Sequence, residues 1–164
     1  MSLPVDVRDL VDRPGAAREV HMSEPVAGLA TELASVPEDV PVRADLLLES
    51  VVEGILVSGP LSGEVNLRCS RCLKDFRRPF EVRVTELFAP DPGAEDEHYP
   101  LAEGAIDIEP LVRDAVVLEM PFSPLCRPDC QGLCEICGGD RNLGECPGHE
   151  LTDPRWDALK DIDL

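Results

Sequence analysis

The sequence predicts an α+β protein with an antiparallel, barrel-like β-sheet, one packed helix and a zinc-stapled cysteine-rich C-terminal extension. Three observations support this fold class. Residues 42–88 are rich in β-branched residues with partial alternation, residues 107–120 are amphipathic, and residues 126–149 contain five cysteines and a histidine. We therefore expect a core domain over residues 1–120 and a metal-binding extension over residues 121–164.

The N-terminal forty residues carry short apolar patches that proline and glycine interrupt. Such interruptions favour irregular connections between short elements. We expect a short strand or helical turn near residues 5–11 and a strand near residues 18–24.

Residues 42–88 are typical of a meander of antiparallel strands. The apolar residues are punctuated by Gly54, Gly59, Gly63 and the sequence CSRC that begins at Cys69. Glycines mark turns and bulges in such a pattern. We therefore expect the CSRC sequence at the tip of a hairpin.

Residues 90–105 are acidic and rich in proline and glycine, so we expect a loop there. A helix follows, with Asp107 as its N-cap and Pro121 just beyond its end. One apolar face of this helix is expected to pack on the sheet. That face consists of Ile108, Leu111, Val112, Ala115 and Leu118. Residues 153–159 predict a last short helix that Trp156 anchors.

The cysteines have the spacing of metal ligands. Two C-x2-C pairs, Cys69 with Cys72 and Cys134 with Cys137, have the form found in structural zinc sites. With the other candidate ligands they supply enough donors for two four-coordinate sites. The full set is Cys69, Cys72, Cys126, Cys130, Cys134, Cys137, Cys146 and His149.

Three divisions of these ligands are open, and they require one or two zinc ions. The first division joins the second C-x2-C pair to Cys146 and His149. It leaves Cys126 and Cys130 to reach the first pair on the hairpin. In the second division the two C-x2-C pairs share one ion, and in the third the four cysteines of residues 126–137 gather alone. The alternative without metal is a set of buried free thiols.

The composition indicates where the chain works. It has 33 acidic and 15 basic residues and a net charge of −18, which keeps a chain soluble and repels bulk nucleic acid. No apolar run is long enough to cross a membrane, and the N-terminal MSLPVDVRDL has charges where a signal peptide is apolar. We expect a cytoplasmic protein whose seven cysteines stay reduced and bind metal.

The sequence favours a protein without catalytic activity. Hydrolytic zinc sites keep an open position among ligands that are usually histidines and carboxylates, and the chain has only His21, His98 and His149. The spacing from Cys130 to Cys137 matches the iron–sulfur motif of radical enzymes that use S-adenosylmethionine. Those enzymes build a barrel after the motif, whereas only 27 residues follow it here.

Residues 68–83, here called the basic island, carry six basic and two acidic residues. Positive charges that bind phosphates occur there beside aromatic rings that stack on unpaired bases, a combination that binds RNA. The candidate RNA-binding residues are Arg68, Arg71, Lys74, Arg77, Arg78, Arg83 and Phe76. The alternative is a solvated strand face that offsets nearby acidic residues.

Three segments together resemble the YceD family, the large ribosomal RNA subunit accumulation proteins. They are LRCSRCLKDF, IDIEPLVRDAVVLEMPF with the PLC that follows, and GLCEICGGDRNLGEC with the later DPRW. The resemblance implies a non-enzymatic role in ribosome biogenesis, the accumulation of 23S rRNA through binding of its precursor. It also implies an alternative, because a gene of a small basic large-subunit ribosomal protein commonly neighbours those of the family. In that alternative the chain is an acidic, zinc-stapled holder of such a protein.

Overall fold

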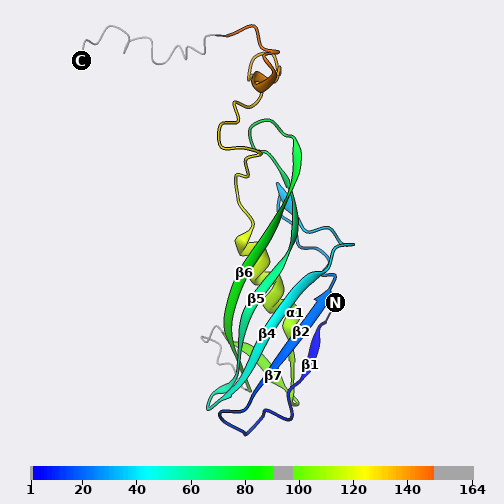
Figure 1. Cartoon of the computed structure of the whole chain (residues 1–164), viewed down its shortest axis with the longest axis vertical. Coiled ribbons are helices and arrows are strands. Elements are labelled where there is room, and N and C mark those ends of the chain that lie inside the picture. The colour runs from blue at the N-terminus through cyan, green and yellow to red at the C-terminus, as the bar shows by residue number, and fades with distance from the viewer. Residues whose placement is uncertain (1, 91–97, 150–164) are drawn as a thin grey trace, which may run out of the picture.

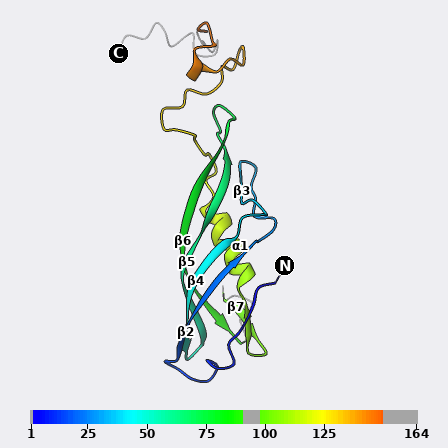
Figure 2. The same ribbon diagram turned by 45° about the vertical axis from the view of Figure 1, so that its right-hand side comes forward.

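A computed structural model gives the structure over residues 2–90 and 98–149. Its elements are β1 (Pro4–Asp6), β2 (Ala17–Glu24), β3 (Ala34–Ser35), β4 (Val42–Val51), β5 (Gly54–Arg68), β6 (Asp75–Ala89), β7 (Tyr99–Ala102), β8 (Ala105–Asp107), α1 (Ile108–Glu119) and the 3-10 turn η1 (Arg141–Leu143). The sheet has the order β1-β8-β7-β6-β5-β4-β2, and β3 pairs with β5 off this path. The sheet curls around α1 as a half-barrel (Figures 1 and 2), and β1 and β2 are its edges.

The predicted meander forms β4, β5 and β6. In β4, alternation turns Val42, Ala44, Leu46 and Leu48 into the core. The hairpin of β5 and β6 is long. Its strands stay paired from Ile55 opposite Phe88 to Arg68 opposite Asp75. At the usual rise per strand residue it spans roughly 45 Å. The CSRC sequence lies at its tip, as predicted, and the chain after α1 runs along the hairpin to that tip (Figure 1).

The expectation of a wholly antiparallel sheet is wrong at one pair of strands. β7 runs parallel to β6, with Phe88 opposite Tyr99 and Ala89 opposite Pro100. Alternation of apolar residues reveals the faces of a strand but not its direction, so the sequence could not show this. The loop prediction for residues 90–105 is also partly wrong, since β7 and the start of β8 lie within it. Stacking of Phe88 on Tyr99, with ring centroids 5.2 Å apart, holds this segment on the sheet.

The helix prediction is confirmed at both ends. The side chain of Asp107 accepts a hydrogen bond from the backbone N–H of Glu109 at 3.1 Å, and α1 ends at Glu119, two residues before Pro121. The buried side chains of α1 are Ile108, Leu111, Val112 and Val116, each worth about 1.5–3 kcal/mol of burial. Leu118, placed on this face by the prediction, is instead 81% exposed. A turn of about 100° per residue puts position 118 at the edge of the apolar stripe, beyond the reach of the sheet.

Near the N-terminus, β2 confirms the strand expected near residues 18–24. Where a short strand or helical turn was expected near residues 5–11, the chain has the end of β1 followed by turns. The predicted C-terminal helix at residues 153–159, with Trp156, lies outside the described residues. No helix in the described part of the chain has the length and apolar character that a membrane crossing requires.

Candidate metal centres

The two C-x2-C pairs adopt the same tight turn. In the first, the N–H of Leu73 donates to the carbonyl of Cys69 at 2.9 Å, and in the second the N–H of Gly138 donates to the carbonyl of Cys134 at 2.8 Å. The residue after each pair is left-handed, with φ of 58° at Leu73 and 71° at Gly138. Glycine adopts this conformation freely, whereas leucine does so at a cost of roughly 1–2 kcal/mol. Each turn brings two thiols to one site.

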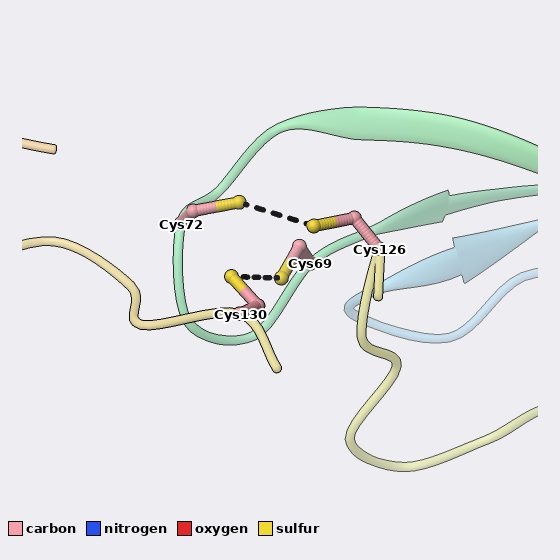
Figure 3. A group of neighbouring side chains, drawn as sticks. All are labelled: Cys69, Cys72, Cys126 and Cys130. Carbon is pink, nitrogen blue, oxygen red and sulfur yellow. Dashed lines mark hydrogen bonds between the residues drawn. The ribbon is translucent and has the colours of Figure 1, made fainter. Parts of the chain in front are cut away.

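Four cysteines from distant parts of the chain form the first cysteine centre. Cys69 and Cys72 come from the hairpin tip, and Cys126 and Cys130 come from the segment after α1. Figure 3 shows the thiols pointing toward one another in two pairs. The Sγ atoms of Cys69 and Cys130 are 3.8 Å apart, and those of Cys72 and Cys126 are 3.6 Å apart. All four sulfur atoms lie within 4.8 Å of one another.

These sulfur separations fit a tetrahedral metal ion. Zinc–sulfur bonds of about 2.3 Å in a tetrahedron place the sulfur atoms about 3.8 Å apart. A disulfide would need about 2.05 Å, so the cysteines are free thiols arranged around a common centre. Three of the four are buried, which shields the site from solvent.

The second cysteine centre contains Cys134, Cys137, Cys146 and His149, whose ligand atoms also lie within 4.8 Å of one another. The Nε2 atom of His149 is buried and has no hydrogen-bond partner among the residues that the structure describes. A buried ring nitrogen normally has a partner. An ion held with the three sulfur atoms would supply one, so the donor set fits a metal.

One thiol in each centre has a lowered pKa. Burial acts to raise the pKa of Cys69, but hydrogen bonds from the backbone N–H groups of Cys126 and Cys72 outweigh it, and the pKa falls to about 6. In the second centre, backbone N–H groups of its own turn, that of Cys137 first, lower the pKa of Cys134 to about 6. Burial and the neighbouring thiols raise the pKa of Cys126 to about 12. A metal ion that displaces the proton of Cys126 would let this sulfur bind as a thiolate despite the raised pKa.

The structure groups the eight candidate ligands as in the first of the three divisions derived from the sequence. The C-x2-C pairs belong to separate centres, and the four cysteines of residues 126–137 are split between them. The sulfur atoms also have polar neighbours: Asn142 Nδ2 lies 3.6 Å from Cys130 Sγ, and Arg141 Nη2 lies 3.9 Å from Cys134 Sγ. Donors of this kind stabilise thiolates and orient metal ligands.

Most of the basic island is engaged in contacts within the chain. Arg71 Nη1 donates to the carbonyl of Cys130 at 2.8 Å, Lys74 Nζ lies 2.7 Å from Asp140 Oδ2, Arg78 Nη2 donates to the carbonyl of Leu125 at 3.0 Å, and Arg68 Nε pairs with Asp75 Oδ1 at 2.8 Å. Three of these four contacts join the hairpin to the extension. A zinc ion with four thiolates carries a charge of −2, and cations beside it offset that charge.

Two candidate RNA-binding residues are exposed on the outer face of the sheet and form no ion pair in the described part of the chain. Arg77 and Arg83 lie on β6 opposite Asn66 and Pro60, and neither forms an ion pair with any residue in the described ranges. Alternation along β6 puts Phe76 on the opposite, inner face, where it packs against the core and Arg78 lies over its ring at 5.2 Å. The predicted mixture of charges and rings is therefore divided between two faces.

Sequence reasoning did not single out Asp140, which joins the second centre to the hairpin. Asp140 is the N-cap of η1, and its Oδ1 accepts from the backbone N–H of Asn142 at 2.9 Å. The pKa of Asp140 is lowered to about 2. The ammonium group of Lys74 makes the largest contribution, and hydrogen bonds from Asn142 add to it. The Asp-x-Asn sequence signals a capped turn, but the partner Lys74 is 66 positions away and no local pattern reveals it.

Comparison with known proteins places the chain in a family. The model of the family described as large ribosomal RNA subunit accumulation protein YceD matches residues 57–163. The chain belongs to the YceD family. An uncharacterized protein of Mycobacterium tuberculosis is 41% identical to this YceD protein over 169 residues, which covers 98% of this chain and 81% of the relative. The protein YlbN of Bacillus subtilis is 29% identical over 140 residues, covering 80% of this chain and 81% of YlbN.

Plant members share a shorter region with this YceD protein. The chloroplastic large ribosomal RNA subunit accumulation protein YCED homolog 1 of Zea mays is 42% identical over 45 residues, 27% of this chain and 15% of the plant protein. No solved structure matches the chain. The resemblance predicted from the three sequence segments is thus confirmed, and the family description assigns a role in the accumulation of large-subunit rRNA.

Proposed function

We propose that this YceD protein supports accumulation of 23S rRNA by binding the precursor rRNA, and that zinc in both cysteine centres holds the binding surface together. The observation that carries the proposal is the construction of the hairpin. A cluster of four cysteines that could hold a metal ion lies at the tip of a hairpin roughly 45 Å long, and exposed arginines lie along its outer face. The family description supplies the link to rRNA.

Zinc is the metal that the donor sets favour. Four cysteines in one centre, and three cysteines with a histidine in the other, are the ligand sets of structural zinc sites. Both sets are closed, with four protein ligands and no position left for a substrate or a reactive water. The zinc ions would therefore shape the protein rather than catalyse a reaction, which agrees with a non-enzymatic role.

The RNA contacts we propose are Arg77 and Arg83 on β6 and Arg43 on β4. The alternation of each strand places all three on the outer face, and all are exposed. Arg77 and Arg83 are six residues apart in one strand, which separates them by roughly 20 Å, so they contact different phosphates. The engaged cations Arg71 and Lys74 contribute indirectly, by holding the hairpin tip on the extension.

A salt titration of RNA binding tests this assignment. Each phosphate contact releases counterions, and each contact adds about 0.7 to the slope of log affinity against log salt for single strands. The double variant Arg77→Gln/Arg83→Gln should lower the slope by about 1.4 on a precursor 23S rRNA fragment. Arg13→Gln removes an exposed arginine between β1 and β2, far from the hairpin tip, and should leave the slope unchanged. Equal slopes for the double variant and the wild type would refute the assignment.

A second candidate function follows from the same charge distribution. The net charge is −18, and four of the six basic residues of the basic island are paired within the chain, so the protein suits a basic partner. The alternative function is a holder for a small basic large-subunit ribosomal protein. In that case the double variant should bind the basic protein as tightly as the wild type or slightly better. Tight binding of that protein without RNA binding at low salt would favour the alternative.

A further inference from the structure

The loop of the second cysteine centre folds back onto the first. Asn142 lies in η1, between the ligands Cys137 and Cys146 of the second centre. Its Nδ2 is 3.6 Å from the Sγ of Cys130, a ligand of the first centre. One side chain that the second centre positions therefore touches a thiol of the other centre.

The amide of Asn142 is fixed in orientation by its partners. Its Oδ1 accepts from the N–H of Gln131 at 2.8 Å and from Arg127 Nη2 at 2.7 Å. Because both partners are donors, the oxygen must face them. The NH₂ group then has one hydrogen for Asp140 Oδ1 at 2.8 Å and one for the sulfur of Cys130.

Other contacts join residues 132–140 to the hairpin tip. The N–H of Leu133 donates to the carbonyl of Arg71 at 3.0 Å, within the C-x2-C turn of the first centre. Gly132 has φ of 75°, and a Cβ at this position would lie 2.9 Å from that carbonyl oxygen, so a larger residue would push the segments apart. The ion pair of Lys74 with Asp140 adds a further contact between the hairpin tip and the segment that contains η1.

These contacts give a physical route by which metal binding in one centre would favour metal binding in the other. A metal ion in the second centre closes the loop that contains η1 and so orders Asn142, whose N–H then stabilises the Cys130 thiolate of the first centre. The conformational entropy of this loop is lost only once, so the second ion binds more favourably after the first. Such coupling is reciprocal. We propose that the two centres load zinc cooperatively and that Asn142 is the positioning residue that couples them. This inference rests on the zinc binding of the proposed function and is independent of RNA binding.

The first test removes one ligand of the second centre and measures the first. Metal-free, reduced full-length chain is titrated with zinc against a competing chelator, and native mass spectrometry counts the bound ions. Loss of a donor beside a metal ligand typically weakens metal binding by roughly 10- to 100-fold, and Cys146→Ser should weaken the first centre by that factor. Wild-type chains at one equivalent of zinc should carry mostly none or two ions. Singly loaded wild-type chains in statistical amounts, or an unchanged first centre in Cys146→Ser, would overturn the coupling.

The second test keeps all eight ligands and changes only Asn142. Asn142→Ala removes both the donor and the acceptor, whereas Asn142→Asp keeps the acceptor for Gln131 and removes the N–H toward sulfur. Both variants should lose cooperativity and weaken the first centre by roughly 10-fold or more. Asn66→Ala, at the chain's other asparagine, is the control and should behave as the wild type.

The outcomes separate the coupling from the proposed function. If Asn142→Asp restores wild-type loading, the N–H contact to sulfur does not carry the coupling and the inference fails. Two ions bound independently would refute the coupling alone. A wild-type chain that binds no zinc would refute both the coupling and the zinc part of the proposed function.

Discussion

Removal of metal should detach the extension from the hairpin while the sheet stays folded. Among the described residues, the ion pair of Lys74 with Asp140 and four hydrogen bonds to backbone oxygen atoms join the two parts. The four hydrogen bonds are Ser70 N to Pro124 O, Leu133 N to Arg71 O, Arg71 Nη1 to Cys130 O and Arg78 Nη2 to Leu125 O. At about 0.5–1.5 kcal/mol each they contribute roughly 2–6 kcal/mol. The extension adds little apolar burial, since Phe122, Ile136 and Leu143 are exposed.

A bound metal ion would therefore be the main source of order in this segment. A structural zinc ion supplies about 10–16 kcal/mol at neutral pH. Fixing the backbone of residues 124–149 costs at least about 1 kcal/mol per residue, more than the four hydrogen bonds provide. The sheet has its own core around Phe88, Leu46, Leu48 and Leu61, so it should stay folded without metal.

Hydrogen exchange measured by mass spectrometry, with and without a zinc chelator under reducing conditions, checks this prediction. Peptides from residues 124–149 should lose protection when zinc is removed, and peptides from β4 and the first half of β5 should keep it. Re-addition of zinc should restore protection in the extension. Protection of residues 124–149 that persists without metal would refute the reasoning, and so would simultaneous loss of protection in β4.

Three further predictions concern stability and activity. Asp107→Ala should destabilise the fold by about 1–2 kcal/mol in urea unfolding, because Oδ1 of Asp107 accepts both the N–H of Glu109 at the start of α1 and the N–H of Leu3. Asp107→Asn keeps one oxygen that can accept both N–H groups. Burial raises the pKa of Asp107, but the hydrogen bonds from Leu3 and Glu109 outweigh it and hold the pKa below its usual 3.8. This stabilisation is therefore present above pH 4 and is lost as the pH falls through the lowered pKa, a loss that Asp107→Asn should not show. Leu73→Gly should raise the thermal midpoint of the zinc-loaded chain, because glycine relieves the left-handed strain at φ of 58°, and a lower midpoint would contradict this account. Purified protein should cleave precursor rRNA no faster than buffer, since both centres are closed, and metal-dependent cleavage lost in a His149 variant would contradict it.

The sequence predicts the features that depend on local patterns. The N-cap Asp107, the end of α1 before Pro121 and the hairpin that carries Cys69 each follow from neighbouring residues, and the structure has all three. The parallel pairing of β7 escapes such reasoning, because strand direction depends on the path of a connection and not on alternation. The exposure of Leu118 escapes it as well, since the width of the apolar stripe depends on how the sheet curves around the helix.

The metal centres show the same limit. The spacing of the cysteines indicates the candidate ligands and leaves three divisions open, because spacing cannot show which segments meet. In the structure, the segment after α1 continues along the hairpin to its tip, where Cys126 and Cys130 meet the first C-x2-C pair, and the second pair lies in the other centre. The sequence predicts the basic island as one RNA-binding surface. In the structure its residues are divided between the two faces of β6 and the hairpin tip, where Arg71 and Lys74 have partners in the extension.

The first cysteine centre also affects how the chain can vary in length. Cys72 and Cys126 are 54 positions apart, and Cys69 and Cys130 are 61 apart, so the centre closes a long loop that contains β6, β7, β8 and α1. The entropy cost of closing a loop grows only with the logarithm of its length, and doubling the loop adds about 0.6 kcal/mol. That increment is small beside the contribution of a structural metal ion. Insertions between β6 and β7 should therefore be tolerated without loosening the hairpin tip, and relatives are free to differ in length there.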